Sequence, residues 1–146
     1  MTNWQDKVKF INSRQMVGSD GDDASPFGSD LVINGRFDIP ANWGCGVGWA
    51  IAGGLLVATN VAIGTNTQQP ILALVPGRKY RTRYTLSGYA SGWVRIRLGW
   101  ANGINRNANG TFVENIICGA GNAILWEANT AVGNYSFDNV SCREVY

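Results

Sequence analysis

The amino-acid sequence predicts an all-β protein: an antiparallel β-sandwich preceded by an extended N-terminal arm. Three observations support this prediction. Glycine is abundant, with 19 of 146 residues, whereas proline is scarce, with 4. Several segments alternate apolar and polar residues, the period of two that is typical of a half-buried strand. Short turn signals rich in Gly and Asn separate these segments, and no long stretch has convincing helical spacing.

Residues 1–30 are predicted to form an arm and a linker. Apolar residues in the arm recur at a loosely helical spacing and need a partner surface to become buried. Residues 17–30 are rich in Gly, Ser and Asp, which is typical of a linker. Residues 1–30 carry a net charge of −2, and residues 31–146 carry +4. An acidic arm and a basic body attract each other, within one chain or between neighbours.

Residues 31–146 are predicted to form one domain of eight or nine short strands. The alternation is clearest over residues 80–86 and 93–100, where Trp100 falls on the buried phase and Trp93 on the exposed one. The other predicted strands are residues 31–38, 49–51, 55–59, 67–75, 111–118, 123–127 and 136–144. Strands of this length and spacing favour a jelly roll.

Composition argues against several classes of function. No run of 18 apolar residues occurs, so no transmembrane helix is expected. The N-terminus lacks the apolar core of a signal peptide, so we expect synthesis in the cytoplasm without ordinary export. Three cysteines (Cys45, Cys118 and Cys142) cannot all pair within one chain and match no zinc motif. Buried free thiols are therefore expected.

Catalysis is not expected either. The chain has no histidine, which removes the commonest general base and any Ser-His or Cys-His pair. Two carboxylates could still hydrolyse a glycoside. The body, however, offers only Asp38, Glu114, Glu127, Asp138 and Glu144. We therefore predict no catalytic residue, no metal and no cofactor.

The order of the turn landmarks resembles a known family. Residues 31–38 read Leu-Val-Ile-Asn-Gly-Arg-Phe-Asp, residues 74–80 read Leu-Val-Pro-Gly-Arg-Lys-Tyr, and residues 137–145 read Phe-Asp-Asn-Val-Ser-Cys-Arg-Glu-Val. Between them lie Gly53-Gly54, Thr67-Gln68-Gln69, Ser87-Gly88-Tyr89 and Ser91-Gly92. This series, over residues 31–146, resembles the carbohydrate-binding-module-like (galactose-binding-like) jelly-roll domains of bacteriophage virion proteins.

The resemblance implies a β-sandwich on the surface of a phage particle. In domains of this type a calcium ion often lies between the first and last strands, where Asp38 and Asp138 are at the matching positions. The alternative for these two carboxylates is hydrogen bonding at turns and strand ends that closes the sandwich, which we expect here. Because the chain is the domain plus a short arm, we expect a small decoration protein rather than a long fibre.

The basic residues of the body are the candidate contact site. Arg81 and Arg83 share one phase of their strand, and Arg95 and Arg97 share a phase with Trp93. A hairpin at residues 88–92 would place all four arginines on one exposed face. That face is either solvated or meets acidic groups, namely a neighbour's linker or an acidic capsid. Trp93 fits a subunit interface or, alternatively, a sugar.

The sequence therefore favours a non-enzymatic virion protein that decorates a phage capsid. We expect a homo-oligomer, a trimer, that docks on the phage shell through its arm and its oligomer interface, with the major capsid protein or another virion protein as partner. The arm anchors are Trp4, Val8, Phe10 and Ile11. The alternative is a carbohydrate-binding module, on a tail fibre or a decoration protein, that adheres to host-surface glycans. Neither nucleic acid nor membrane is an expected partner, because the net charge is small and no span is present.

Overall fold

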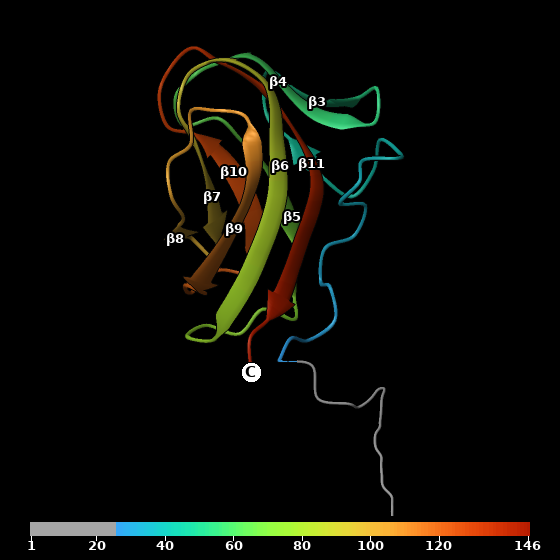
Figure 1. The fold of residues 1–146 in the computed structure, drawn as a ribbon, viewed down its shortest axis with the longest axis vertical. Helices are drawn as coiled ribbons and strands as arrows, with labels where there is room; N and C mark the ends of the chain where they lie inside the picture. The colour runs from blue at the N-terminus through green and yellow to red at the C-terminus, as the bar shows by residue number, and fades with distance from the viewer. Residues whose placement is uncertain (1–25) are drawn as a thin grey trace, which may run out of the picture.

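The computed structural model describes residues 26–146 as a sandwich of two antiparallel β-sheets, with no helix in this range (Figure 1). The predicted all-β class and jelly roll are confirmed. The arm anchors Trp4, Val8, Phe10 and Ile11 lie outside the described residues. No helix among the described residues has the length and apolar character needed to cross a membrane.

Each sheet has five strands, and most neighbours within a sheet are distant in sequence. The first sheet has, in spatial order, β2 (Gly44–Cys45), β5 (Asn66–Pro70), β10 (Ala123–Ala128), β7 (Val94–Leu98) and β8 (Ala101–Asn102). The second sheet has β3 (Trp49–Ala52), β4 (Leu55–Val61), β11 (Gly133–Glu144), β6 (Lys79–Ser91) and β9 (Gly110–Ile117). The second sheet faces the viewer in Figure 1.

Aromatic side chains fill the space between the sheets. Trp126 of the first sheet stacks on Phe137 of the second with ring centroids 4.8 Å apart. Tyr84 of β6 meets both rings edge-on, at 5.7 and 5.9 Å. Each such pair stabilises the fold by roughly 0.5–1.5 kcal/mol beyond its buried area. Tyr84 lies on the inward phase predicted from the alternation over residues 80–86, whereas no inward phase was predicted for Trp126 or Phe137.

The predicted first strand, residues 31–38, is not a strand, although it does lie beside the last one. Asn34 and Phe37 have positive φ angles of 55° and 54°, so this segment turns rather than extends. Its backbone still meets β11, because the Leu31 amide donates to the Cys142 carbonyl (2.8 Å). A Cβ at Gly35 would lie 2.1 Å from the Val140 carbonyl oxygen, so glycine is required for this close approach.

A different carboxylate from the predicted pair connects these two segments. Oδ1 of Asp30 accepts the amides of Val32 and Cys142, each at 3.0 Å. Within residues 26–146, the hydrogen bond of the Asp138 side chain is that from the adjacent Asn139 amide, at 2.8 Å, and Asp38 is exposed. The prediction that Asp38 and Asp138 close the sandwich is therefore wrong, because residues 31–38 turn away before Asp38 can reach β11.

The three cysteines are free thiols, as predicted. Cys118 and Cys142 are buried, and burial raises the pKa of the Cys142 thiol to about 12. Cys45 is exposed instead, because it lies on β2, a two-residue strand at the edge of the first sheet. The expectation of burial therefore holds for two of the three.

Candidate functional site

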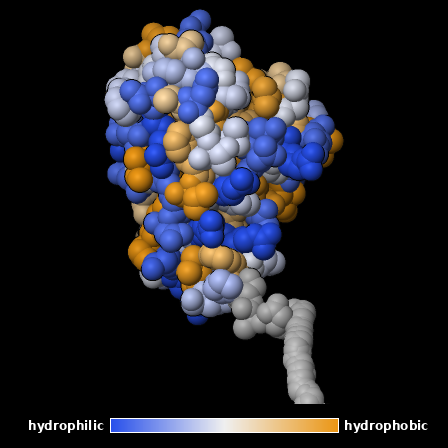
Figure 2. Space-filling model, viewed as in Figure 1, coloured by the Kyte–Doolittle hydropathy of each residue, from blue (hydrophilic) through white to orange (hydrophobic). Residues whose placement is uncertain are grey.

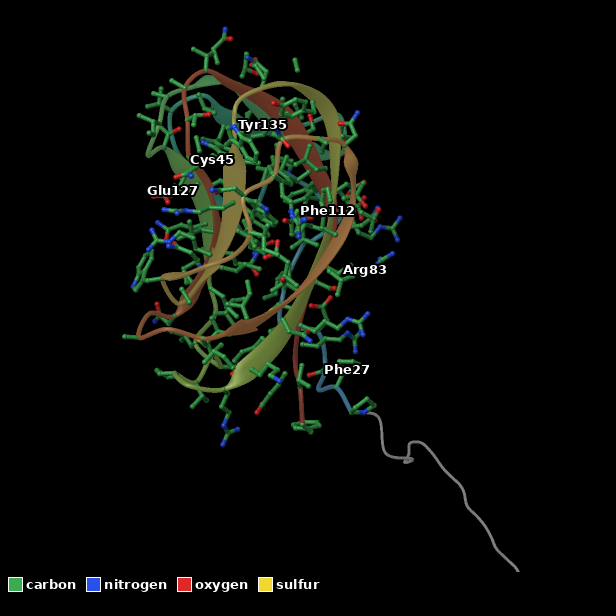
Figure 3. All side chains as sticks on the ribbon, turned by 60° about the vertical axis from the view of Figure 1, so that its left-hand side comes forward. Phe27, Cys45, Arg83, Phe112, Glu127 and Tyr135 are labelled. Atoms are coloured by element: carbon green, nitrogen blue, oxygen red, sulfur yellow. The ribbon has the colours of Figure 1, made fainter. Side chains whose placement is uncertain are left out.

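The four predicted arginines do not share a face. β6, which carries Arg81 and Arg83, lies in the second sheet, and β7, which carries Arg95 and Arg97, lies in the first. The chain crosses between the sheets after Gly92, so the predicted hairpin does not form. Figure 3 shows the result: the labelled Glu127 of the first sheet and Arg83 of the second lie on opposite sides of the sandwich. Both arginine pairs lie on the outward phase of their strands, but alternation does not specify which sheet a strand joins.

The outer face of the first sheet carries two rows of side chains across its strands. In the first row, Arg97, Leu125, Gln68 and Gly44 are register partners on β7, β10, β5 and β2. In the second row, Arg95, Glu127 and Asn66 are partners on β7, β10 and β5. We call the polar members Asn66, Gln68, Arg95, Arg97 and Glu127 the polar rows.

Ion pairs fix the centre of the polar rows. Arg95 donates from Nε and Nη2 to Oε1 of Glu127, at 3.2 and 2.9 Å. Arg97 donates from Nη1 to Oε2 of the same carboxylate, at 3.4 Å, and from Nη2 to the Trp100 carbonyl, at 2.8 Å. All three side chains are partly exposed. The face therefore presents donors and acceptors that are already oriented, and one carboxylate offsets part of the positive charge.

Two exposed tryptophans lie at the ends of β7. Trp93 precedes the strand and is 41% exposed, on the side opposite to the buried Val94 and thus the same side as Arg95, as predicted. Trp100 follows the strand and is 49% exposed, so its predicted place in the core is wrong. The Arg97 guanidinium lies 5.7 Å from the Trp100 ring, which places this ring beside the polar rows.

A tight turn explains the exposure of Trp100. Leu98 pairs with Ala101, so Gly99 and Trp100 are the two central residues of a β7–β8 hairpin. Both have positive φ, 55° and 74°, as a type I′ turn requires. Glycine adopts this conformation readily, but a bulky residue does so only under strain. Backbone strain of this kind is concentrated at functional sites in proteins.

Gly121 leaves the space in which the Trp100 ring lies. A Cβ at this position would come within 2.2 Å of the indole Nε1 and 2.4 Å of Cδ1. Any side chain at Gly121 would therefore displace the ring. Two features therefore set the position of the Trp100 ring: the strained β7–β8 turn, and the space left because Gly121 has no side chain.

A shallow depression of about 360 Å³ continues the face toward β2. Its lining comes from β2, β5 and the loops beside them, and consists of Gly44, Cys45, Gly46, Val47, Thr65, Asn66 and Gln68. Asn66 and Gln68 belong both to this depression and to the polar rows, so the two features are continuous.

The other two predicted arginines lie on the outer face of the second sheet, with a third arginine. Arg81 is directly opposite Arg143 of β11, and Arg83 is opposite Ser141. Within residues 26–146 no group of three or more His, Cys, Asp or Glu side chains is arranged to hold a metal ion.

Comparisons with known proteins identify the fold. No protein-family model matches the chain, and no curated protein matches it. Among solved structures, BiXyn10A CBM1 in its apo form, a carbohydrate-binding module, matches with a TM-score of 0.58 and 15% identity, over 81% of this chain and 98% of that one. The enzymatically active domain of bacteriophage CBA120 tailspike protein 4 matches with a TM-score of 0.50 and 17% identity, over 80% of this chain and 21% of that one.

A third similar structure is a family 35 carbohydrate-binding module from an environmental isolate, with a TM-score of 0.45 and 18% identity, over 85% of this chain and 89% of that one. At these low sequence identities, the structural similarity shows a shared fold and nothing about function. The fold is that of the carbohydrate-binding-module-like jelly roll, and the resemblance predicted from the sequence is confirmed.

Sequence reasoning missed several members of the outer face. Glu127 was considered only as a possible catalytic carboxylate, and Gln68 only as a landmark. Their register opposite the arginines depends on the pairing of β10 with β5 and β7, which no local pattern encodes. The exposure of Trp100 could have been predicted, because Gly99 directly before it allows the chain to form a hairpin turn after Leu98.

Proposed function

We propose that this protein is a carbohydrate-binding module that holds an oligosaccharide on the outer face of the first sheet. One observation carries the proposal: two exposed tryptophans at the ends of β7 bracket two rows of oriented polar side chains. Carbohydrate-binding neighbours in fold support it.

The chemistry of the face suits a sugar. The tryptophan rings offer flat apolar surfaces for the C–H faces of pyranose rings, with a polar handle on each indole. Glu127 offers acceptors, Arg95 and Arg97 offer donors, and the amides of Gln68 and Asn66 offer both, which matches hydroxyl groups that donate and accept. Ligand sites usually combine aromatic and apolar side chains with a small number of well-placed polar groups.

The dimensions suit an oligosaccharide rather than a single sugar. Trp93 and Trp100 flank the five residues of β7, and a strand rises about 3.3 Å per residue, so the two tryptophans lie at opposite ends of a strand roughly 15 Å long. A chain of several sugar units spans that length. We propose binding without catalysis, since Glu127, the carboxylate of the polar rows, is held in ion pairs with Arg95 and Arg97.

The finer predictions from the sequence stay predictions. Capsid decoration, a homotrimer, a capsid partner and a virion location rest on the resemblance and on arm residues outside the described range. The tailspike likeness favours a phage setting, and it leaves the alternative of glycan adhesion better supported than capsid decoration.

Tryptophan substitutions test the proposal. A glycan array identifies a bound oligosaccharide, and titration calorimetry then compares the variants. Trp93→Ala and Trp100→Ala should each weaken binding about tenfold or more, because central aromatic contacts carry most of the energy of a binding surface. Leu72→Ala is the control: Leu72 is an apolar residue 85% exposed that lies outside the depression and the polar rows, and its loss should leave affinity unchanged.

A second variant moves a ring without removing it. Gly121→Ala should displace Trp100 and weaken binding nearly as much as Trp100→Ala, while the melting temperature stays close to that of the wild type, since an exposed ring can shift at little cost. Wild-type affinity in Trp93→Ala, Trp100→Ala and Gly121→Ala alike would rule out this face as the sugar site.

A further inference from the structure

We propose that the outer face of the second sheet carries a separate site for the anionic group of an acidic saccharide, a carboxylate or a sulfate. The site consists of Arg81, Arg83 and Arg143 with Ser141 and Phe27, which together line a depression of about 270 Å³. Figure 2, which shows this face, has strongly hydrophilic side chains beside hydrophobic ones over its middle and lower parts.

Strand register brings the three arginines together. Arg81 and Arg143 are direct partners on β6 and β11, and Arg83 and Ser141 are partners two residues further along β6. Directly opposite side chains on one face have Cβ atoms about 4.5–5.5 Å apart, and like charges at such positions repel. The three arginines therefore lie side by side on this face and line one depression with Ser141.

Among the described residues, these arginines lack the carboxylate partners that four other arginines of the sandwich have. Arg78, Arg95, Arg97 and Arg106 each lie within 4.0 Å of a carboxylate. Within residues 26–146, no carboxylate lies at ion-pair distance from Arg81, Arg83 or Arg143.

The acidic residues nearest in register are already engaged. Asp138 pairs in register with Thr85, beyond Arg83, and accepts the Asn139 amide. Glu144 pairs with Arg78. An anion at the depression would therefore remove a repulsion that the described part of the chain leaves uncompensated.

Two of the guanidinium groups are held in place. The Arg81 guanidinium lies 4.9 Å from the centroid of the Phe27 ring, a cation–π contact, and Phe27 is itself bridged to Val145. Arg143 donates from Nη1 to the Gly28 carbonyl, at 3.2 Å. Arg83 is exposed and remains available. A site with fixed donors binds an anion at a lower entropic cost than three mobile side chains would.

The composition of the site indicates its ligand. A guanidinium presents a planar fork of N–H donors that matches a carboxylate or a sulfate. Ser141 can hydrogen-bond a hydroxyl of the saccharide beside the anionic group. The saccharide part of this inference rests on the proposed function, whereas the anion part rests on the arginines alone. Nucleic acid fits less well, because its binding draws on a more extended basic surface.

Matched polysaccharides test the site on the full-length protein. Polygalacturonate and its methyl ester differ in the carboxylate charge, and dextran sulfate and dextran differ in the sulfate. The wild type should bind the charged member of at least one pair tenfold or more tightly than the neutralised member. Which pair responds distinguishes a carboxylate from a sulfate ligand.

Matched variants locate the binding. Arg83→Gln should weaken binding of the charged ligand about tenfold or more, and Arg83→Lys should recover part of it, because the charge stays while the fork is lost. Arg36→Gln is the control: it removes the same charge from another exposed arginine with no ion pair among the described residues, and it should bind like the wild type. Equal melting temperatures establish that Arg83→Gln is folded.

Three results would overturn the inference. The first is equal binding of the charged and neutralised ligands, and the second is equal loss in Arg36→Gln and Arg83→Gln. The third is binding of a DNA oligonucleotide through Arg83 as tightly as the best acidic saccharide, which would indicate a general polyanion surface. The proposed function is tested separately, because Trp100→Ala acts on the opposite face and should leave charged-ligand binding at Arg83 intact.

Discussion

Both outer faces of the sandwich carry arginines at alternate positions of a strand. The arginines of the first sheet are paired with a carboxylate, whereas those of the second sheet have no such partner among the described residues. On the first sheet, the register partner of Arg95 is Glu127, and the pair is bonded at 2.9 Å. On the second sheet, the register partner of Arg81 is Arg143. Alternation along a strand decides that these side chains point outward. The residue opposite decides whether the face is a balanced hydrogen-bonding surface or an unbalanced cationic one, and hence which ligand chemistry it suits.

Another arginine, Arg106, lies at the edge between the two sheets, where its carboxylate partner Glu114 is buried. Glu114 of β9 is nearly fully buried and accepts the Tyr84 hydroxyl at 2.8 Å, the Ile104 amide at 2.8 Å and Arg106 Nη2 at 3.2 Å. Burial, and then the Glu114 charge, raise the pKa of Tyr84 above its ordinary value. This carboxylate connects β6, β9 and the loop after β8.

The largest expected effect is therefore the loss of Glu114. Glu114→Ala would leave the Arg106 charge and the Tyr84 hydroxyl without their partner and should lower the free energy of unfolding by about 3–5 kcal/mol, measured by chemical denaturation. The control is Glu144→Ala, whose partner Arg78 is mostly exposed, and it should cost less than about 1 kcal/mol. Similar losses in the two variants would show that burial does not set the strength of these ion pairs.

The next largest effect is expected from a substitution that leaves the arginines of the first sheet unpaired, like those of the second. Glu127→Gln leaves Arg95 and Arg97 without a carboxylate and should lower the free energy of unfolding by about 1 kcal/mol, since the pairs are partly exposed. It should also give this face a new affinity for the charged polysaccharides, measured in the Arg83→Gln background. No gain in that background would show that unpaired arginines alone do not create an anion site.

The smallest change in stability is expected from the reverse substitution, which adds a carboxylate to the arginines of the second sheet. Ser141→Glu places a carboxylate opposite Arg83 and beside Arg81 and Arg143. It should raise the free energy of unfolding by about 0.5 kcal/mol, because an opposite-charge pair replaces repulsion. Binding of the charged ligand should disappear, while binding of the neutral oligosaccharide stays the same. Ser141→Gln, which adds a similar volume without charge, is the control and should keep part of the anion binding.

The sequence predicted what depends on local pattern. The alternation over residues 80–86 identified the inward Tyr84, and the alternation over residues 93–100 predicted the exposure of Trp93. Both follow from the two-residue period of a strand. The landmark order also led to the correct jelly-roll fold.

The errors arose where long-range pairing or turn geometry decides the outcome. Arg83 and Arg95 were placed on one face because their strands are adjacent in sequence, whereas β6 and β7 belong to different sheets. Trp100 was assigned to the core because the alternation was extended one residue past its end, into a turn. Asp30 was assigned to the linker, residues 17–30, whereas it accepts the Cys142 amide of the last strand.

The central claim is that the outer face of the first sheet binds carbohydrate, and oxidative footprinting read by mass spectrometry tests it most directly. Among the described residues, Trp93 and Trp100 are exposed tryptophans, and Trp43, Trp49 and Trp126 are buried. With a saturating oligosaccharide selected on the array, oxidation of Trp93 and Trp100 should fall several-fold, while exposed Tyr146, at the C-terminus, should be oxidised as before. Unchanged oxidation of both tryptophans under saturating ligand would contradict the account.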